Sequence, residues 1–383
     1  MEGGVGDGEG AFVKHSFALS LLAAFTAPAF AEVPDKANAP VPADTVALMA
    51  KKDMAASAPV LVRTFKKEAV LEVWKQTRTG RYALLKSFPI CRWSGQLGPK
   101  RKTGDRQTPE GFYPVAAKQL NPNSHYYLSF DVGFPNAYDR AQGSSGAYLM
   151  VHGTCSSAGC YAMTDKQVGE IYALVRDALA AGQPAFQFPA FPFRMTAENL
   201  AKHRSDQNFD FWRQIKDGAD RFEATGEEPK VSVVAGRYTF SGRTSQSEAQ
   251  GSARAASEKA RVDALVSDGI ASIRTTYSDG GQHAIFAAML KKGDNLGDVS
   301  RPEALAYAGK EVVLVPARKA PPKPVEVAAA RTIIDDVPRD LAGVPIAGGY
   351  SMLATGLSPA STTLVANLVV KVRPADTPLN VTR

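Results

Sequence analysis

The sequence lacks metal-binding spacings, a nucleic-acid signature and internal repeats, and these absences exclude several classes of protein. It contains only five histidines and three cysteines in 383 residues, and no spacing of His, Cys or carboxylate side chains suggests a metal site. The net charge is +7, but the positive residues are scattered and form no basic helix, so we expect no nucleic-acid partner. We also expect no cofactor. What is present, 44% hydrophobic and 22% charged residues, suits a globular protein.

An apolar run near the N-terminus, Phe17–Phe30, is too short for a membrane-spanning helix, which needs roughly twenty residues. The run ends in Ala29–Ala31, the small-x-small pattern that signal peptidase requires. We therefore expect residues 1–31 to be a cleaved signal peptide and the protein to be periplasmic, with no stable membrane span. Met1–Gly10 is acidic, unlike the positive start of a signal peptide, so we expect translation to begin near Val13.

The chain after this signal divides by composition into three parts. Residues 32–58, rich in Ala, Pro and Lys, are predicted to form a linker or a short lead-in helix. Residues 59–240 contain short runs of β-branched and aromatic residues between turn signals, which is typical of a hairpin-rich sheet. The predicted strands are Val62–Phe65, Ala69–Trp74, Tyr82–Phe88, Tyr126–Phe130, Tyr148–Val151 and Val231–Phe240.

A helix is predicted to start at Thr164, because its hydroxyl can cap the first turn while Gln167 reaches back. Apolar residues then recur at helical spacing as far as Leu179, and Gly182 is a plausible end. A second helical stretch runs to Phe222. The sequence therefore predicts a β-rich α+β fold with flanking helices.

The last part, residues 241–383, is predicted to be largely low-complexity and partly disordered, with no role that the sequence reveals. Gly242–Ala260 has few large apolar residues to offset the entropy of ordering. Pro321–Pro324 is predicted to be a semi-rigid spacer. Two further segments, Val312–Val315 and Thr363–Val372, are candidate strands without a site-like cluster.

The segment Val151–Met163 combines residues that suit nucleophilic catalysis. A cysteine is a good nucleophile only as the thiolate, and both a neighbouring histidine and a helix N-terminus lower the thiol pKa. Cys160 shortly precedes the predicted helix, and His152 ends the apolar strand upstream. Gly153 and Gly159 permit sharp turns between them. Nearby backbone N–H groups would then be free to face a developing oxyanion.

The same residues also have structural interpretations. A cysteine is more often buried or in a disulfide, and a lone histidine is usually structural. Cys155 competes with Cys160 as the nucleophile, and we prefer Cys160 for the glycine before it and the helix after it. Because an odd cysteine count in an oxidising compartment indicates one pair and one free thiol, a disulfide between Cys91 and Cys155 is our hypothesis.

This segment resembles the cysteine signature of the L,D-transpeptidases with a YkuD-type catalytic domain. Thr108–Tyr113 is similar to the Thr-Pro-x-Gly strand that precedes the active site in that family. Where the family usually has a histidine just before the Gly-Cys pair, this chain has Ala158, a departure typical of the YafK-like branch. Further stretches that resemble this branch are Leu97–Lys100, Leu120–Ser124, Phe134–Asp139 and Phe191–Thr196. The resemblance covers roughly residues 59–240.

The resemblance implies a β-sheet catalytic domain in which Cys160 is the nucleophile and His152 the general base and proton donor. The substrate would be the stem peptide of peptidoglycan, attacked at the carbonyl of meso-diaminopimelate to give a thioester. An amine or water would resolve that thioester. The residues expected to bind the substrate or its oxyanion are Gly159, Ser157, Gly153 and Arg194.

Three alternatives remain open from the sequence. A hydrolase of the same family would release a lipoprotein or peptide attached to diaminopimelate, and Ala158 favours it over cross-linking. Sortase-like transpeptidases also place a histidine before a cysteine, although much farther apart. In the third alternative the protein binds peptidoglycan without catalysis, and Cys160 is vestigial.

Overall fold

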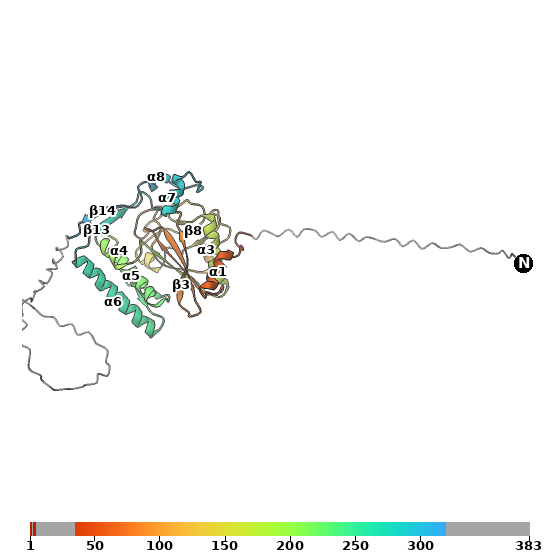
Figure 1. Cartoon of the computed structure of the whole chain (residues 1–383), viewed down its shortest axis with the longest axis horizontal. Helices are drawn as coiled ribbons and strands as arrows, with labels where there is room; N and C mark the ends of the chain where they lie inside the picture. The colour runs from red at the N-terminus through yellow and green to blue at the C-terminus, as the bar shows by residue number, and fades with distance from the viewer. Residues whose placement is uncertain (2, 5–34, 319–383) are drawn as a thin grey trace, which may run out of the picture. The chain divides into compact units, whose positions relative to one another are not determined.

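The computed structural model describes residues 1, 3–4 and 35–318, shown in colour in Figure 1. Apart from residues 1 and 3–4, the predicted signal peptide lies outside the described residues, as do the Pro321–Pro324 spacer and the candidate strand Thr363–Val372. No helix in the described ranges is long and apolar enough to cross a membrane.

One five-stranded sheet is built from strands near the start of the described chain together with β5 and β10. Its strand order is β3-β2-β1-β10-β5, and every neighbouring pair is antiparallel except β1 and β10. The strands are β1 (Val60–Phe65), β2 (Val70–Gln76), β3 (Tyr82–Pro89), β5 (Gly111–Val115) and β10 (Phe186–Phe191). The predicted strands Val62–Phe65, Ala69–Trp74 and Tyr82–Phe88 are confirmed.

A second five-stranded sheet carries the cysteine segment. Its order is β4-β9-β8-β7-β6, and only β8 and β9 run parallel. The strands are β4 (Arg92–Trp93), β6 (Leu120–Asn121), β7 (Ser129–Asp131), β8 (Met150–His152) and β9 (Tyr161–Ala162). The strands predicted at Tyr126–Phe130 and Tyr148–Val151 are confirmed as β7 and β8, with starts that come later.

The core lies between these sheets and is strongly aromatic. Phe130 of β7 meets Phe186 and Phe188 of β10 edge to face, with ring centroids 5.5 and 6.0 Å apart. Tyr161 of β9 contacts Phe188 in the same manner, at 5.7 Å. All four side chains are fully buried. Edge-to-face contacts add specific geometry to the apolar burial, so the two sheets hold each other in a fixed position.

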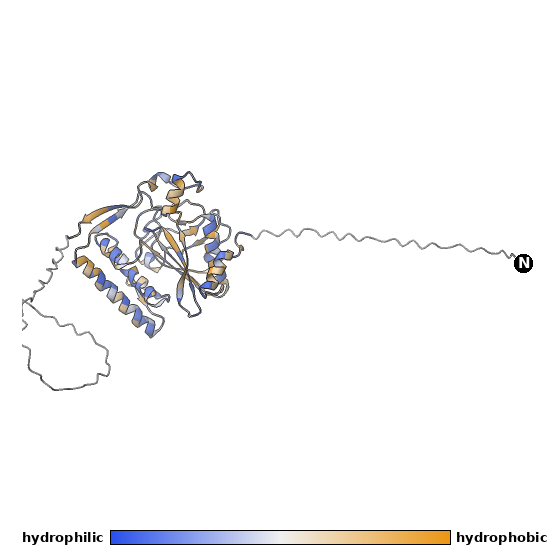
Figure 2. Cartoon of the chain, viewed as in Figure 1, coloured by the Kyte–Doolittle hydropathy of each residue, from blue (hydrophilic) through white to orange (hydrophobic). Residues whose placement is uncertain are grey.

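Helices cover these sheets, and the bounds of α3 (Asp165–Ala180) match the sequence prediction. Thr164 accepts a hydrogen bond from the Gln167 N–H, which is the predicted cap. The apolar stripe of α3 is buried, and Figure 2 shows that hydrophobic and hydrophilic residues alternate along the helices. The other helices here are α1 (Ala43–Lys51), η1 (Ala117–Gln119), α2 (Ala137–Ala141), α4 (Ala197–Lys202) and α5 (Phe209–Thr225). Helix α1 confirms a short lead-in helix within residues 32–58.

The single strand predicted at Val231–Phe240 is wrong. Two strands, β11 (Lys230–Val234) and β12 (Arg237–Ser241), form a hairpin there. The turn residues Ala235 and Gly236 have φ values of 48° and 72°. Tight hairpin turns favour positive φ at both central residues, and glycine supplies one of them at no steric cost. The Ala-Gly pair was the signal for this turn.

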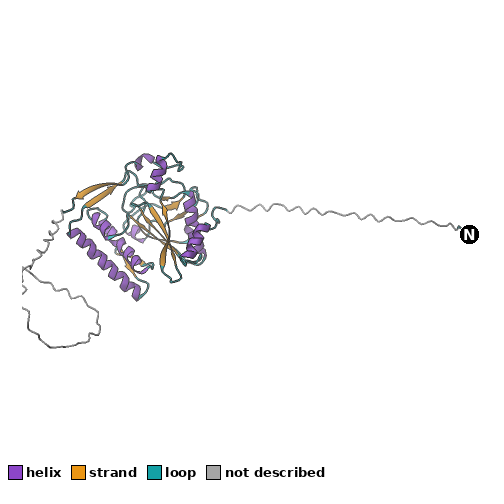
Figure 3. Ribbon diagram, viewed as in Figure 1, coloured by secondary structure: helices purple, strands orange, loops and turns teal. Residues whose placement is uncertain are grey.

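The prediction that Gly242–Ala260 would not be ordered is also wrong. Helix α6 (Ser245–Ser267) spans it and packs beside α5, as Figures 1 and 3 show. Low hydrophobicity was misleading, because the segment is rich in strong helix formers and ion pairs join the helix to α5. Glu258 pairs with buried Lys216, and Glu248 pairs with Arg221.

The chain after α6 forms a separate two-stranded sheet. Strands β13 (Ser272–Thr276) and β14 (Lys310–Val315) form an antiparallel pair, which confirms the candidate strand Val312–Val315. Between them lie α7 (Ala284–Lys291) and α8 (Pro302–Leu305). The α+β, sheet-rich fold class predicted from the sequence is confirmed.

Candidate active site

His152 ends β8 and is buried, with 3% of its surface exposed. Its Nδ1 lies 2.5 Å from the carbonyl oxygen of Gly153. A carbonyl can only accept, so Nδ1 carries the proton and Nε2 of the neutral ring is the acceptor. Burial lowers the pKa of His152, although the Gly153 carbonyl opposes this. The ring is therefore neutral at pH 7 and ready to take a proton at Nε2.

Strand pairing brings the backbone of Cys160 next to the strand that ends in His152. Because Val151 pairs with Tyr161 and His152 with Ala162, Cys160 falls opposite Met150. His152 lies two residues beyond Met150 on the same strand. The spacing and rise of paired strands put the Cα atoms of two positions related in this way about 8 Å apart.

The Cys160 thiol lies against the backbone of the adjoining strand. The Met150 N–H donates to its Sγ at 3.4 Å, and the Tyr148 carbonyl oxygen is 3.9 Å away. Among the hydrogen bonds of residues 35–318, none joins this thiol to the His152 ring. The pairing of β8 with β9 is the feature that brings the backbones of the two residues close.

The expected lowering of the thiol pKa is not found. Burial raises the pKa of Cys160, and the nearby Asp131 carboxylate raises it too, against the Met150 N–H and Lys100. Strand β9 lies between Cys160 and helix α3, and the helix start is occupied by its own cap at Thr164. The resting pair is therefore a neutral thiol and a neutral imidazole.

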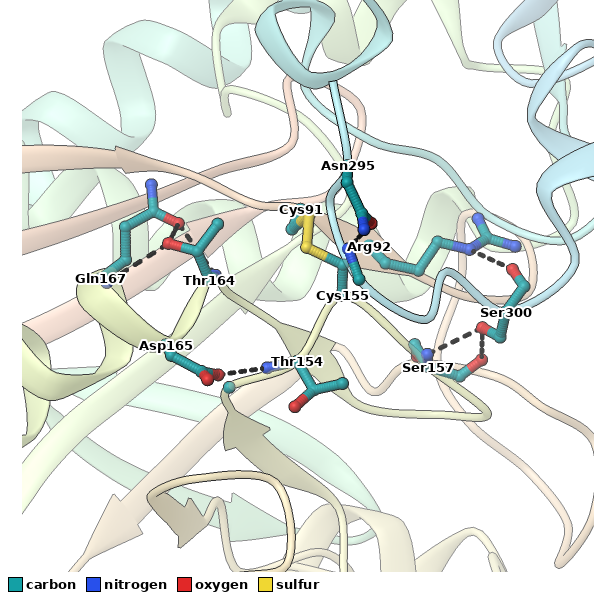
Figure 4. The surroundings of a disulfide bond; sticks show 12 residues. Cys91, Arg92, Thr154, Cys155, Ser157, Thr164, Asp165, Gln167, Asn295 and Ser300 are labelled. Atoms are coloured by element: carbon teal, nitrogen blue, oxygen red, sulfur yellow. Dashed lines mark hydrogen bonds between the residues drawn. A yellow bond between two sulfur atoms is a disulfide. The ribbon is translucent and has the colours of Figure 1, made fainter. Parts of the chain in front are cut away.

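The disulfide hypothesis is confirmed. Cys91 and Cys155 are bonded, with Cα atoms 5.3 Å apart, and Cys160 is the free thiol among the described residues. Figure 4 shows this disulfide beside the loop that joins His152 to Cys160. The same loop is held at Thr154, whose N–H donates to Asp165 at the start of α3 at 2.9 Å. The loop is thus tied to two different elements.

The two predicted glycines are required by the backbone. Gly159 has a φ of 141°, which side chains other than hydrogen rarely allow. At Gly153 there is no room for a side chain, because a Cβ would lie 2.4 Å from Asp165 Oδ1 and 2.8 Å from the Tyr126 carbonyl oxygen. Gly153 also supplies the carbonyl that orients His152.

The Ser157 side chain stabilises the turn formed by Gly159 and Cys160 through hydrogen bonds. Its hydroxyl oxygen accepts the N–H groups of Gly159, at 3.3 Å, and Cys160, at 3.1 Å. It also donates to the Cys160 carbonyl at 2.8 Å, and the side chain is almost fully buried. The N–H groups predicted to face an oxyanion are therefore already engaged. Ser157 organises the loop instead of projecting toward a substrate.

Similarity to known proteins identifies the family of this chain. The L,D-transpeptidase catalytic domain family, YkuD, matches residues 57–192. Over 190 residues the chain is 48% identical to the "Putative L,D-transpeptidase YafK" of Escherichia coli K12, covering 50% of this chain and 77% of that one. The protein of the same name from Escherichia coli O157:H7 gives the same values. The chain belongs to the L,D-transpeptidase family.

Membership of this family confirms the YkuD-type, YafK-like resemblance found in the sequence. Solved structures add less. The helical cell shape determining protein Pgp2 from Campylobacter jejuni aligns with 50% of this chain and 80% of its own, at 16% identity and a TM-score of 0.28. An alignment at that TM-score carries no argument about fold or function.

One residue predicted from the family pattern is not brought to the cysteine. Arg194 pairs with Glu72 of β2 at 2.8 Å, and its guanidinium lies 4.5 Å from the centre of the Phe65 ring. Both partners belong to the first sheet, whereas Cys160 adjoins the second. The ion pair and the cation–π contact explain this arginine without a substrate carboxylate.

Sequence reasoning missed two tyrosines of this L,D-transpeptidase site. The half-exposed ring of Tyr126 lies 4.7 Å from the His152 ring and covers it. Tyr148, with 77% of its surface exposed, supplies the carbonyl beside the thiol. Both open the segments predicted as strands, but only the pairing of β7 with β8 places them around the site.

Proposed function

We propose that the protein is a periplasmic acyltransferase that acts on the stem peptides of peptidoglycan through a thioester on Cys160. The observation that supports this proposal is the parallel pairing of β8, which ends in His152, with β9, which directly follows the free thiol of Cys160. The disulfide removes the two other cysteines from consideration. A disulfide also suits an oxidising compartment, which supports export by the predicted signal peptide.

In the proposed first step, Cys160 Sγ attacks the carbonyl carbon of meso-diaminopimelate while Nε2 of His152 takes the thiol proton. The tetrahedral intermediate then collapses, the C–N bond breaks, and the leaving amine receives that proton from His152. The products are a Cys160 thioester and either D-alanine or another amine. In the second step an acceptor amine or water gives a proton to His152 and attacks the thioester carbonyl; the C–S bond breaks, and His152 returns the proton to Cys160 Sγ.

The oxyanion of the intermediate needs donors placed before the reaction begins. We propose the backbone N–H groups of Gly159 and Cys160 for this role. Since the Ser157 hydroxyl now accepts both, at 3.3 and 3.1 Å, it must release one of them when the intermediate forms. Substrate binding at Cys160 is the event that would exchange these partners.

A hydrolase of the same site is the second candidate, in which water resolves the thioester and a peptide or a peptidoglycan-linked lipoprotein is released. The observation that favours it is Ala158, an exposed residue beside Gly159 where the family usually has a histidine. A methyl group offers an acceptor amine neither a hydrogen bond nor a base.

Analysis of muropeptide products tests the proposal and separates the candidates. Purified peptidoglycan is incubated with the wild type, with Cys160→Ala and with Arg194→Ala as a matched control outside the site. A new cross-link or exchanged amino acid supports transfer, and free diaminopimelate carboxylates support hydrolysis. We expect Cys160→Ala to abolish either product and Arg194→Ala to retain it. Product formation by Cys160→Ala would exclude the proposed nucleophile.

A further inference from the structure

A segment outside the family match wraps the loop that carries Cys160. We call residues 277–303 the strap. Its Gly281 forms an antiparallel bridge with Trp93, and the His283 N–H donates to the Ile90 carbonyl at 3.0 Å. Phe286 of α7 packs against the disulfide and is itself buried. The family match ends at residue 192, so this contact joins a separate part of the chain to the catalytic loop.

The strap reaches the cysteine turn through one hydroxyl. Ser300 Oγ accepts the Ser157 N–H at 2.9 Å and donates to the Ser157 carbonyl, also at 2.9 Å. Figure 4 shows this pair of hydrogen bonds from Ser300 to Ser157. Ser157 in turn holds the Cys160 N–H. Only one residue therefore separates Ser300 from the backbone of the nucleophile.

A buried carboxylate of the strap also reaches Ser157 indirectly, through an arginine. Asp279, 3% exposed, accepts from Arg106 Nη2 at 2.7 Å, and that same nitrogen donates to the Ser157 carbonyl at 3.1 Å. Arg92 and Arg301 also lie within 3.6 Å of the carboxylate. Burial alone would raise the pKa of Asp279, but the hydrogen bonds from Arg106 and the Gly95 N–H lower it. Asp279 is therefore ionised at neutral pH and fixes Arg106 on Ser157.

We infer that Ser300 and Asp279 are positioning residues for Cys160. Together they hold both backbone groups of Ser157, so that the Ser157 hydroxyl can set the turn of Gly159 and Cys160. Neither residue touches the reacting atoms. Displacements of about 1 Å in a catalytic group cost large factors in rate, so loosening this anchor should slow attack by the thiol more than substrate binding. The inference rests on the proposed function of Cys160.

The test compares Ser300→Ala with Ser300→Thr, which keeps a hydroxyl, in the full chain. Ser272→Ala is the matched control, because Ser272 is a buried serine of β13 whose hydroxyl donates to Ser205 instead. The measurement is the limiting rate of Cys160 acylation by a stem peptide, and the concentration giving half that rate, followed by intact mass. Asp279→Asn is a second variant that keeps the shape of the side chain.

We expect Ser300→Ala and Asp279→Asn to lower the limiting rate about ten-fold with little change in the half-saturating concentration, the pattern of a lost transition-state interaction. Ser300→Thr and Ser272→Ala should stay within about three-fold of wild type. An unchanged rate in both Ser300→Ala and Asp279→Asn, with wild type acylated, would overturn the inference.

A second readout separates this inference from the proposed function. The pH dependence of Cys160 alkylation by iodoacetamide needs no substrate and reports the surroundings of the thiol. We expect its midpoint to move by about 0.5 unit or more in Ser300→Ala and to stay fixed in Ser272→Ala. If wild type is not acylated, the proposed function fails, and the alkylation profiles alone decide: an unmoved midpoint in Ser300→Ala rejects the positioning role.

Discussion

Removal of the disulfide between Cys91 and Cys155 should destabilise the fold by an amount that follows from its place in the chain. The two cysteines are 64 residues apart in sequence. Cross-linking a loop of that length removes unfolded-state entropy equivalent to about 4 kcal/mol at 25 °C. Both cysteines are buried against Phe286, so the bond lies within packed structure. We expect the double variant Cys91→Ala/Cys155→Ala to lose about 4 kcal/mol of unfolding free energy.

Urea denaturation followed by tryptophan fluorescence measures this loss. With an m-value of about 2–3 kcal/mol/M, the midpoint should fall by about 1.3–2 M. Cys160→Ala is the control, since it removes the free thiol and keeps the disulfide, and its midpoint should stay close to wild type. The double variant should also acylate slowly, because Cys155 lies in the loop between the predicted base and nucleophile.

A loss below about 1 kcal/mol in the double variant would refute this reasoning. It would mean either that the unfolded chain is already restricted in this region or that the strap holds the loop without the bond. Wild type treated with a reducing agent distinguishes these outcomes from an effect of the alanine side chains, because it breaks the bond and leaves both sulfur atoms in place.

Three further predictions concern the site itself. Because burial lowers the pKa of His152, the acid limb of the pH profile of kcat/KM should have its midpoint below pH 6.5. A midpoint above that value would contradict a neutral resting base. Tyr126→Ala uncovers the His152 ring, so we expect the same limb to move to higher pH; an unmoved limb would show that the tyrosine does not shield it. Gly153→Ala places a Cβ 2.4 Å from Asp165 Oδ1, so we expect about 1–3 kcal/mol of destabilisation in a urea titration and reduced acylation. Unchanged stability there would mean that the loop moves freely.

The features that sequence reasoning predicted well are those fixed by neighbouring residues. The cap at Thr164 is one, because a hydroxyl and a glutamine three residues later satisfy the same helix turn. The disulfide is another, since an odd cysteine count leaves few pairings. The cysteine signature is a third, because the catalytic family requires its residues in a fixed local order.

The features that sequence reasoning missed depend on contacts between distant segments. Arg194 has the chemistry to bind a substrate carboxylate, but in the folded chain its guanidinium forms an ion pair with Glu72 of strand β2. Helix α6 is stabilised by partners on α5, which composition does not reveal. Ser300 and Ser157 lie 143 positions apart in the chain, and only the folded strap brings the two serines together.

Intact mass after brief incubation with a stem peptide or a carbapenem, followed by peptide mapping, tests the catalytic assignment most directly. We predict one covalent adduct on Cys160 in the wild type, none in Cys160→Ala, slower formation in His152→Ala and an unchanged rate in Arg194→Ala. An adduct on any other residue, or a Cys160 that remains unmodified by both reagents and alkylates slowly, would contradict the assignment of Cys160 and His152 as nucleophile and base.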